Sequence, residues 1–481
     1  MKKTFTGRSI SILLILCIAI SCKVSKPVPM PAIHGQPSRF SEGDTGSSIG
    51  MISWRQFFED PHLVKLIDEA LTNNPDLLSA FEQINIARAN LSVAKGLSAP
   101  SLKAIVSAGA DKFGDYTMNG VGNFDTNKSP NINNNQQIPT NPTPDYFIGL
   151  RSSWEIDIWG KLKNQKKSVA ARLLATERGK QFIMTSLVAE VAASYFELLA
   201  LDYELLIIRK NIQLQETALE LVKVQKEAGR ATELAVQQFE AQLLHTQTLS
   251  DFTLQQINIL ENHLNNIAGR YPQAVSRDSN ILKKTLPPSL RTGLPTQMLI
   301  RRPDIQQAEL ELEAAKTDVL AARAAFLPSL SLTPYIGMNA FKLDLLFNPG
   351  SFAWGFVAGL MAPIYDQNRI RAGYAMSNAN NKIAIYNYQK KLLSSYGEVN
   401  TILKGIGYNR EAFLFKQNEV NTLSAAVSTA NDLYVTGYAT YLEVITAQKG
   451  VLDAELQLTG IKKQLFQSVI DLYHALGGGW E

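Results

Sequence analysis

The chain contains very little cysteine or histidine, and this scarcity limits the chemistry that it can perform. Only Cys17 and Cys22 occur among 481 residues, too few for a disulfide framework or a cysteine-based metal site. The five histidines are scattered, with no pair spaced four residues apart beside a glutamate. Serine-nucleophile, P-loop and dinucleotide-binding motifs are also missing. We therefore expect a protein that is not an enzyme and holds no cofactor and no metal.

An excess of one charge is absent too. The chain has 47 Lys and Arg residues against 43 Asp and Glu residues, which gives a formal net charge of +4. Basic residues are interleaved with acidic ones and form no extended patch, so the pattern argues against nucleic acid as a partner.

A long apolar run occurs only at the N-terminus. Residues 1–21 combine a basic start with an apolar segment that ends in small residues, which is the pattern of an export signal. Cys22 follows in a sequence that resembles a lipoprotein cleavage site, although Ala19 occupies the position where leucine is usual. We predict a lipidated Cys22 and an N-terminal extension over 22–55; the alternative is an ordinary secretory signal with an incidental cysteine. No later run approaches the ~20 apolar residues of a membrane helix, so any membrane span must consist of strands.

Proline is missing from two long stretches, Asp145 to Tyr271 and Ile364 to the C-terminus. Both stretches carry apolar residues at three- and four-residue spacing. Each contains a glycine that can end a helix and, three residues later, a threonine that can cap the next one: Gly229 with Thr232, and Gly437 with Thr440. The pattern predicts helical hairpins at 161–268 and 369–476, with first arms about 100 Å long. Three glycines in the second long arm indicate bends or local looseness there: Gly397, Gly405 and Gly407.

The chain consists of two copies of one design. The first copy's Asn74-Pro75-Asp76 matches Arg302-Pro303-Asp304 at an offset of 228, and Gly269 matches Gly477 at an offset of 208. We assign the first repeat to 56–285 and the second to 286–481, with an equatorial region formed by about 270–300 and the chain ends. The change in offset reflects an extra segment in the first copy, 123–144, whose Asn, Pro and Thr content predicts a polar surface loop.

Two segments of alternating apolar residues precede each hairpin. They predict strands at 101–112, 145–157, 329–341 and 352–364, which are long enough to cross a bilayer obliquely. A β-hairpin on a soluble core would alternate in the same way. Four membrane strands cannot close a barrel and open edges are not tolerated in lipid, so several chains must pool their strands. The predicted fold is mostly α with membrane β, and three chains would supply twelve strands.

Four motifs carry a family resemblance: WEIDIWGK at 154–161, RRPDI at 301–305, YLEV at 441–444 and ALGGGW at 475–480. In this order and spacing they resemble the TolC-like outer-membrane efflux family, in its lipoprotein (NodT-type) branch. The resemblance implies a homotrimer with a twelve-stranded barrel in outer-membrane lipid and a long α-helical periplasmic tunnel. It implies a periplasmic adaptor and an inner-membrane resistance-nodulation-division pump as partners. The chain would be a passive exit duct for drugs, toxic small molecules or metal ions.

Two other functions share part of this pattern. A periplasmic coiled-coil adaptor or scaffold lipoprotein would also have long helices and a lipid anchor, but it would not need paired strands of bilayer length in both repeats. An outer-membrane channel for type I protein secretion would have the same architecture and a different cargo.

The resemblance also implies roles for the hairpin tips and for one helix. The tips that would contact the adaptor are Gly229, Arg230, Ala231 and Thr232 in the first repeat, and Gly437, Tyr438, Ala439 and Thr440 in the second. The periplasmic gate would consist of Leu442, Thr446 and Lys449. Thr446 replaces an acidic residue of the family's pattern, so an aspartate ring is not expected. A leucine ring would exclude water by dewetting and Lys449 would add positive charge; for Leu442 the alternative is simple coiled-coil packing.

A cluster of basic residues begins each long helix. Its members are Lys161, Lys163, Lys166 and Lys167 in the first repeat, and Arg369 and Arg371 in the second. At the edge of a membrane such a cluster could contact lipid phosphates. A solvated helix face explains the same residues equally well.

Overall fold

The structure is a computed structural model that describes residues 46–278, 281–285 and 291–480, together with positions 35, 37, 39 and 40. The predicted signal peptide, Cys22 and most of the N-terminal extension lie outside the described residues.

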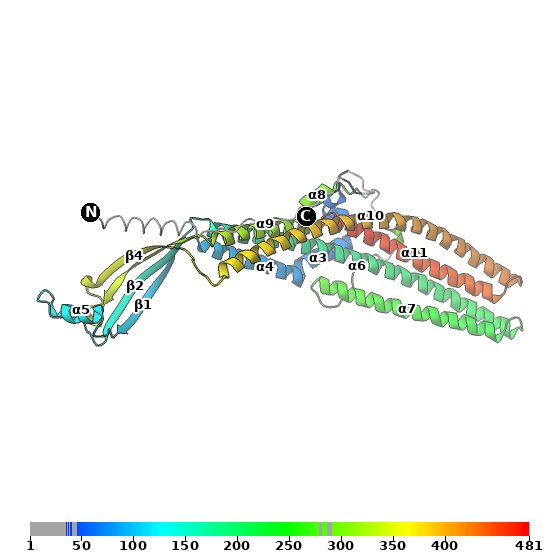
Figure 1. Cartoon of the computed structure of the whole chain (residues 1–481). Coiled ribbons are helices and arrows are strands. Elements are labelled where there is room, and N and C mark those ends of the chain that lie inside the picture. Colours follow the sequence, from blue (N-terminus) through cyan, green and yellow to red (C-terminus); the bar gives the residue numbers. More distant parts are fainter. Residues whose placement is uncertain are drawn as a thin grey trace. The chain divides into compact units, whose positions relative to one another are not determined.

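Four strands form one antiparallel sheet in the order β1-β2-β3-β4 (Figure 1). Their bounds are Ser101–Asp111, Thr143–Ile156, Ser329–Ala340 and Phe352–Met361, so each lies within three residues of its predicted span. Each strand pairs with its neighbour along nearly its full length, while β1 and β4 each have one edge without a partner strand among the described residues. The fold therefore has the predicted four-stranded sheet with two open edges.

The register places the apolar residues of all four strands on one face of the sheet. Leu150 lies opposite Ile336, which lies opposite Trp354 in the next strand. Because side chains alternate along a strand, the remaining apolar positions follow on the same face; they include Val106, Ile148, Leu332, Phe356 and Leu360. These side chains are largely exposed, with Trp354 at 68% and Phe356 at 65%. The other face is mainly polar or glycine-rich, as at Gly149, Arg151 and Thr333.

The long helices have the predicted hairpin arrangement. In the first repeat α6 (Lys161–Glu227) is followed by α7 (Glu233–Ile267), and in the second α10 (Arg369–Thr436) is followed by α11 (Tyr441–Ala475). The α10 helix is continuous through Gly397, Gly405 and Gly407, and it also contains Gly373. Shorter helices precede the strands: α3 (Pro61–Asn73), α4 (Pro75–Gly96), α8 (Pro295–Arg301) and α9 (Pro303–Ala324). Near the ends of the described chain are α2 (Trp54–Phe57) and the 3-10 turns η1 (Ile49–Met51) and η3 (Ile281–Lys283).

The extra segment of the first repeat is more ordered than the predicted polar loop. It begins within α5 (Met118–Thr126) and contains the 3-10 turn η2 (Asn134–Gln136). The hydroxyl of Thr117 caps α5 by accepting from the backbone N–H of Gly120 at 3.1 Å. Asn133 caps η2 in the same way. Composition correctly indicated a polar surface, but it did not reveal these two caps, so the prediction of a plain loop was wrong. The β3–β4 connection contains two further turns, η4 (Leu343–Leu345) and η5 (Pro349–Ser351).

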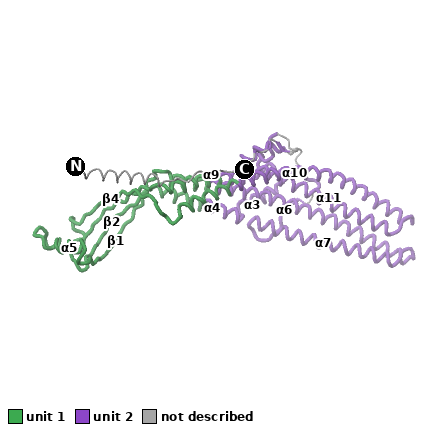
Figure 2. The backbone as a smooth tube through the Cα atoms, viewed as in Figure 1, with its two compact units in different colours: residues 1–31, 86–173, 311–385 green, residues 32–85, 174–310, 386–481 purple. Residues whose placement is uncertain are grey.

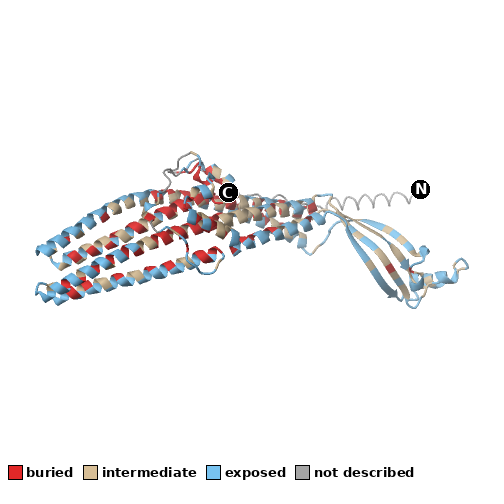
Figure 3. Ribbon diagram, turned by 180° about the vertical axis from the view of Figure 1, so that it is seen from behind, coloured by how far each residue is buried: buried red, intermediate tan, exposed pale blue. Residues whose placement is uncertain are grey.

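The chain divides into two compact units (Figure 2). The first contains Ile86–Leu173 and Glu311–Ile385, and therefore the whole sheet. The second contains Leu174–Leu310 and Tyr386–Glu481 together with the segment that ends at Asn85. Buried residues concentrate along the helices of the second unit, whereas the strands are exposed or half-buried apart from Phe147 of β2 (Figure 3).

One helix requires a correction to the expectation about apolar runs. The α6 helix contains an 18-residue window with a mean hydropathy of 1.5, apolar enough to cross a membrane by composition alone. However, 56% of that window is buried inside the protein. Tyr195 and Leu199 of α6 are fully buried in the largest hydrophobic cluster, together with Leu63 of α3 and Leu472 of α11. The apolar stretch of α6 is thus accounted for by core packing.

Candidate functional site

The first hairpin tip is closed by local hydrogen bonds. Gly229 has a φ of +71°, which ends α6 in the left-handed region that favours glycine. The N–H of Arg230 then donates to the carbonyl of Gln225 at 2.8 Å. Thr232 starts α7 by accepting from the N–H of Ala235 at 3.2 Å. The backbone of the predicted tip 229–232 is therefore a tight, defined turn.

The second tip repeats this geometry. Gly437 has a φ of +82°, and the N–H of Tyr438 donates to the carbonyl of Leu433 at 2.8 Å. The N–H of Thr440 donates to a carboxylate oxygen of Glu443 at 2.8 Å, which completes the N-terminal cap of α11. The ring of Tyr438 is 85% exposed, so this tip presents an aromatic side chain on its surface.

The helices that end at the two tips pack against each other. The hydroxyl of Tyr434 donates to the side-chain carbonyl of Gln225, which links α10 to α6. A small apolar cluster near these helix ends contains Val222 of α6, Phe239 of α7 and Val444 of α11. The two hairpins are therefore held together close to their tips.

The predicted gate residues lie on one face of α11. Leu442, Thr446 and Lys449 are spaced four and three residues apart, and all three are exposed. The buried face of the same helix carries Val444 and Gln448 instead. Leu442 is 56% exposed, so packing within this chain does not explain it. Its role in a gate stays a prediction.

The basic cluster divides into paired and unpaired members. Lys161 forms an ion pair with Glu155 at 2.5 Å, and Arg369 forms one with Asp366 at 3.0 Å. Among the described residues, the remaining members of the cluster make no ion pair; they are Lys163, Lys166, Lys167 and Arg371. Internal pairing weakens the positive field, and contact with lipid phosphates stays a prediction.

The two repeats share a contact that the sequence did not predict. In the first, the side chain of Asn74 donates to the carbonyl of Ile267, at the end of α7, at 2.9 Å. In the second, Arg302 donates to the carbonyl of Ala475, at the end of α11, at 2.9 Å. The donors differ by 228 positions and the acceptors by 208, so the contacts are equivalent in the repeat. The matched triplets that begin at Asn74 and Arg302 indicated that these two residues are equivalent, but the sequence did not indicate which carbonyl groups they bind.

Arg302 occupies the centre of a buried network. It donates twice to Asp304, at 3.0 and 2.8 Å, and once to Glu398 at 2.7 Å. Lys391 also pairs with Asp304 at 3.0 Å. The Arg302 and Asp304 side chains are only 6% and 4% exposed. Burial alone would raise the pKa of Asp304, but the hydrogen bonds and charges of Arg302 and Lys391 outweigh it and lower that pKa to about 2.

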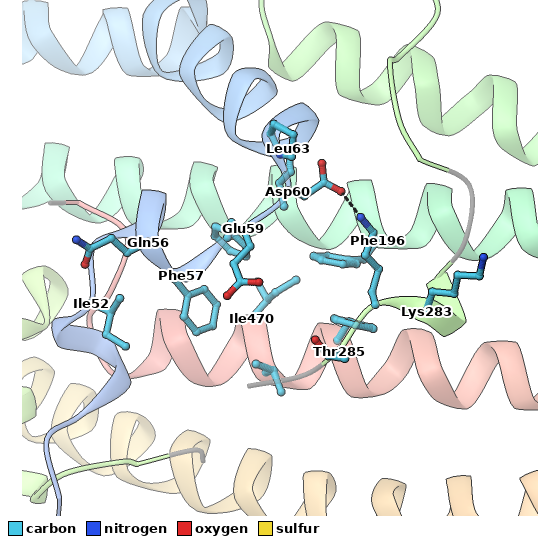
Figure 4. A pocket seen from close by; sticks show the side chains of 15 residues that line it. Ile52, Gln56, Phe57, Glu59, Asp60, Leu63, Phe196, Lys283, Thr285 and Ile470 are labelled. Carbon is cyan, nitrogen blue, oxygen red and sulfur yellow. Dashed lines mark hydrogen bonds and ion pairs between the residues drawn. The ribbon is translucent and has the colours of Figure 1, made fainter. Parts of the chain in front are cut away.

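A cavity of about 460 Å³ lies in the second unit between the N-terminal segment, α6 and α11 (Figure 4). Apolar side chains form most of its lining and include four phenylalanines, among them Phe57, Phe196 and Phe466. At its edge Asp60 pairs with Lys284 at 2.9 Å and accepts from the hydroxyl of Tyr195 at 3.1 Å. Because these polar groups satisfy one another, the arrangement holds the N-terminal segment in place. The described residues contain no cluster of His, Cys, Asp and Glu that could hold a metal ion.

Comparison with known proteins gives one family and full-length relatives. The sequence pattern of the family described as outer membrane efflux protein matches residues 66–270 and again 294–478. The two matches are offset by 228 at their starts and 208 at their ends, which confirms the internal repeat. The probable outer membrane lipoprotein SilC of Salmonella typhimurium is 30% identical over 483 residues, covering 98% of both chains.

Two further similarities involve CusC. The cation efflux system protein CusC of Escherichia coli strain CFT073 is 30% identical over 482 residues, covering 98% of this chain and 99% of its own. A solved structure of CusC, described in terms of folding and transmembrane channel formation, matches with a TM-score of 0.79 at 28% identity. That match covers 95% of this chain and 100% of the CusC chain.

Proposed function

Because the chain belongs to the outer membrane efflux protein family, we propose that it is the outer-membrane exit duct of a tripartite efflux pump. The observation that carries the proposal is the exposed apolar face of the four-stranded sheet, opposite a polar face. A sheet with this pattern suits a barrel wall with lipid on one side and water on the other. A coiled-coil adaptor or scaffold lipoprotein would not need a sheet with an exposed apolar face.

The assembly that we propose is a homotrimer. The outer edges of β1 and β4 have unpaired backbone groups, which hydrocarbon cannot satisfy. Three copies joined β4 to β1 would close a twelve-stranded barrel without edges. The exposed apolar residues of the long helices would then find partners in neighbouring copies; examples are Leu244, Phe252, Ile259, Leu414 and Phe415.

We further propose that the chain is anchored through a lipid on Cys22 and that its tips bind a periplasmic adaptor coupled to an inner-membrane pump of the resistance-nodulation-division class. The lipoprotein name of SilC supports the anchor. The paired tips, with exposed Tyr438 and Arg230, offer the adaptor a preformed surface. The transported solutes are small molecules or metal ions; the name of CusC supports cations as one class.

Planar-bilayer recording of the purified protein tests the channel. We expect detergent-resistant trimers that conduct ions in steps, mostly closed at rest because the adaptor would favour the open state. A monomer that leaves membranes without detergent and never conducts would contradict the proposal. Transport of a folded-protein substrate in place of small solutes would instead indicate the type I secretion alternative.

Cross-linking in cells tests the adaptor surface. A Tyr438→Cys variant should form an adduct with the periplasmic adaptor when a thiol-directed cross-linker is added. Ser424→Cys is the matched control, since Ser424 is exposed like Tyr438 but lies within α10, about four helical turns before the tip. Equal labelling of both positions, or none at Tyr438→Cys, would argue against the tips as the docking surface.

A further inference from the structure

A second cavity, of about 660 Å³, lies in the first unit where β1 ends and β2 begins. Asp111 pairs with Thr143 across these strands, and Asp145 follows two residues later on the same face. Because Gly149 shares that face, the cavity opens from the polar side of the sheet. The extra segment of the first repeat and the β3–β4 connection form its other walls.

The amide side chains of these walls are oriented by the loops that carry them. The side-chain oxygen of Asn133 accepts from two backbone N–H groups, at 3.0 and 3.1 Å. That of Asn348 accepts from the N–H of Gly350 at 2.9 Å, and that of Gln136 accepts from the N–H of Asn133 at 3.1 Å. Since the oxygens are engaged, the NH₂ groups of these three residues remain as donors at the cavity wall, with no acceptor among the described residues.

The walls are also fixed in place. Asn127 and Ile138 exchange two hydrogen bonds, at 2.8 and 2.7 Å, across the extra segment. Lys342 donates to the carbonyl of Asn134 at 2.9 Å, which ties this segment to the end of β3. A site whose polar groups are held before binding loses less conformational entropy when a ligand arrives.

The lining has the chemistry of a site for hydroxyl groups. Its carboxylates, Asp111 and Asp145, accept hydrogen bonds, and its amides donate them. One oxygen of Asp145 already accepts from the side chain of Asn339 at 2.6 Å, which leaves its second oxygen for a ligand. The hydroxyl oxygen of Thr143 is buried without a partner among the described residues. Two phenylalanines, Phe113 and Phe341, add apolar surface. No residue that lines the cavity is basic, so the two carboxylates disfavour phosphate and carboxylate ligands.

We propose that this cavity binds a neutral oligosaccharide. Alternating donors and acceptors match the hydroxyls of a sugar, and the aromatic rings match its C–H faces. A divalent cation fits less well, because only two carboxylates are present and the side-chain oxygens of Asn133, Gln136 and Asn348 are already engaged. This inference rests on the proposed outer-membrane placement, in which the polar face of the sheet is the water-filled side of the barrel, so the source is a free neutral glycan.

The test is a titration of the full-length protein in detergent, followed by saturation-transfer NMR. The probes are maltotriose and cellotriose, which are neutral, and trigalacturonic acid as a charged counterpart. We expect at least one neutral probe to bind and trigalacturonic acid to bind much less. Binding of either neutral trisaccharide supports the proposal, and binding of only one of them indicates which glycosidic linkage the cavity prefers.

Matched variants locate the site. Asn133→Asp with Asn348→Asp keeps the oxygens that hold the turns but removes two donors, so affinity should fall about tenfold or more. Asn119→Asp with Asn131→Asp makes the same charge change at exposed positions that do not line the cavity, and should change affinity less than about twofold. The proposal is overturned if no neutral probe binds up to about 10 mM, if trigalacturonic acid binds with the same affinity as the neutral probes, or if both double variants lose affinity equally. Conductance measured on the same sample separates these results from a failure of the proposed channel.

Discussion

Replacing Arg302 by alanine should destabilise the second unit far more than its single lost side chain suggests. The substitution leaves the carboxylate of Asp304, 4% exposed, with Lys391 as its remaining cation. It also removes the donor to the carbonyl of Ala475. Breaking a buried pair by removing one partner costs about 3 kcal/mol or more, because an uncompensated charge stays buried.

Arg55→Ala is the matched control for this prediction. Arg55 also pairs with an aspartate, Asp68, but the two side chains are 57% and 41% exposed. Solvent screening makes such an exposed pair contribute little to stability. Guanidinium unfolding of the detergent-solubilised protein, followed by far-ultraviolet circular dichroism at neutral pH, should therefore separate the two variants clearly.

Acid provides a second test of the same network. The pKa of Asp304 is lowered to about 2, against an ordinary value near 3.8, so its ionised form stabilises the fold at higher pH. That stabilisation, about 2 kcal/mol, is complete above pH ~4 and is lost as the pH falls toward 2. The difference in unfolding free energy between the native protein and Arg302→Ala should therefore decrease over this range. Equal shifts of the unfolding midpoint for Arg302→Ala and Arg55→Ala would refute the reasoning, and so would a difference in unfolding free energy that does not change with pH.

Two further predictions concern the membrane face and the gate. Phe356→Lys places a charge on the apolar face of β4 and should reduce the amount of trimer in the outer membrane, because a charge in lipid costs about 2–4 kcal/mol. Val357→Lys, at an equally exposed position on the opposite face, should be tolerated. The amount of heat-modifiable trimer on gels measures the effect, and equal losses in both variants would count against the assignment of faces. Leu442→Ala should raise the resting conductance of single channels several-fold by admitting water at the constriction. Leu234→Ala, at the equivalent position of the first repeat and 55% exposed, is its control and should leave conductance unchanged; the reverse result would place the gate elsewhere.

Much of the fold could be predicted because its determinants are local. Gly229 and Thr232 end and restart the first hairpin through bonds to residues within five positions, so their spacing alone indicates the turn. The alternation of apolar residues indicated the strands for the same reason. Their shared exposed face became visible only when the register joined Leu150, Ile336 and Trp354.

The rest depends on contacts between distant residues. Arg302 was recognised in a motif, but its burial and its bond to Ala475 depend on a chain separation of 173 positions. The caps at Thr117 and Asn133 were missed because composition, dominated by Asn and Pro, concealed single positions with a defined role. The sequence also left open whether Leu442 packs within the chain, because the answer depends on which face of α11 is buried.

The equivalent contacts of Asn74 and Arg302 show that the two repeats can make the same contact with side chains of different charge. Both side chains hold the last carbonyl of a returning helix, yet one is a neutral amide and the other a cation. The charged version needed counter-ions, which Asp304 and Glu398 provide, while the amide needed none. The Asn74 contact is thus independent of proton concentration, whereas the Arg302 contact depends on carboxylates that are ionised. In strong acid the contact at the end of α11 should therefore weaken before the contact at the end of α7.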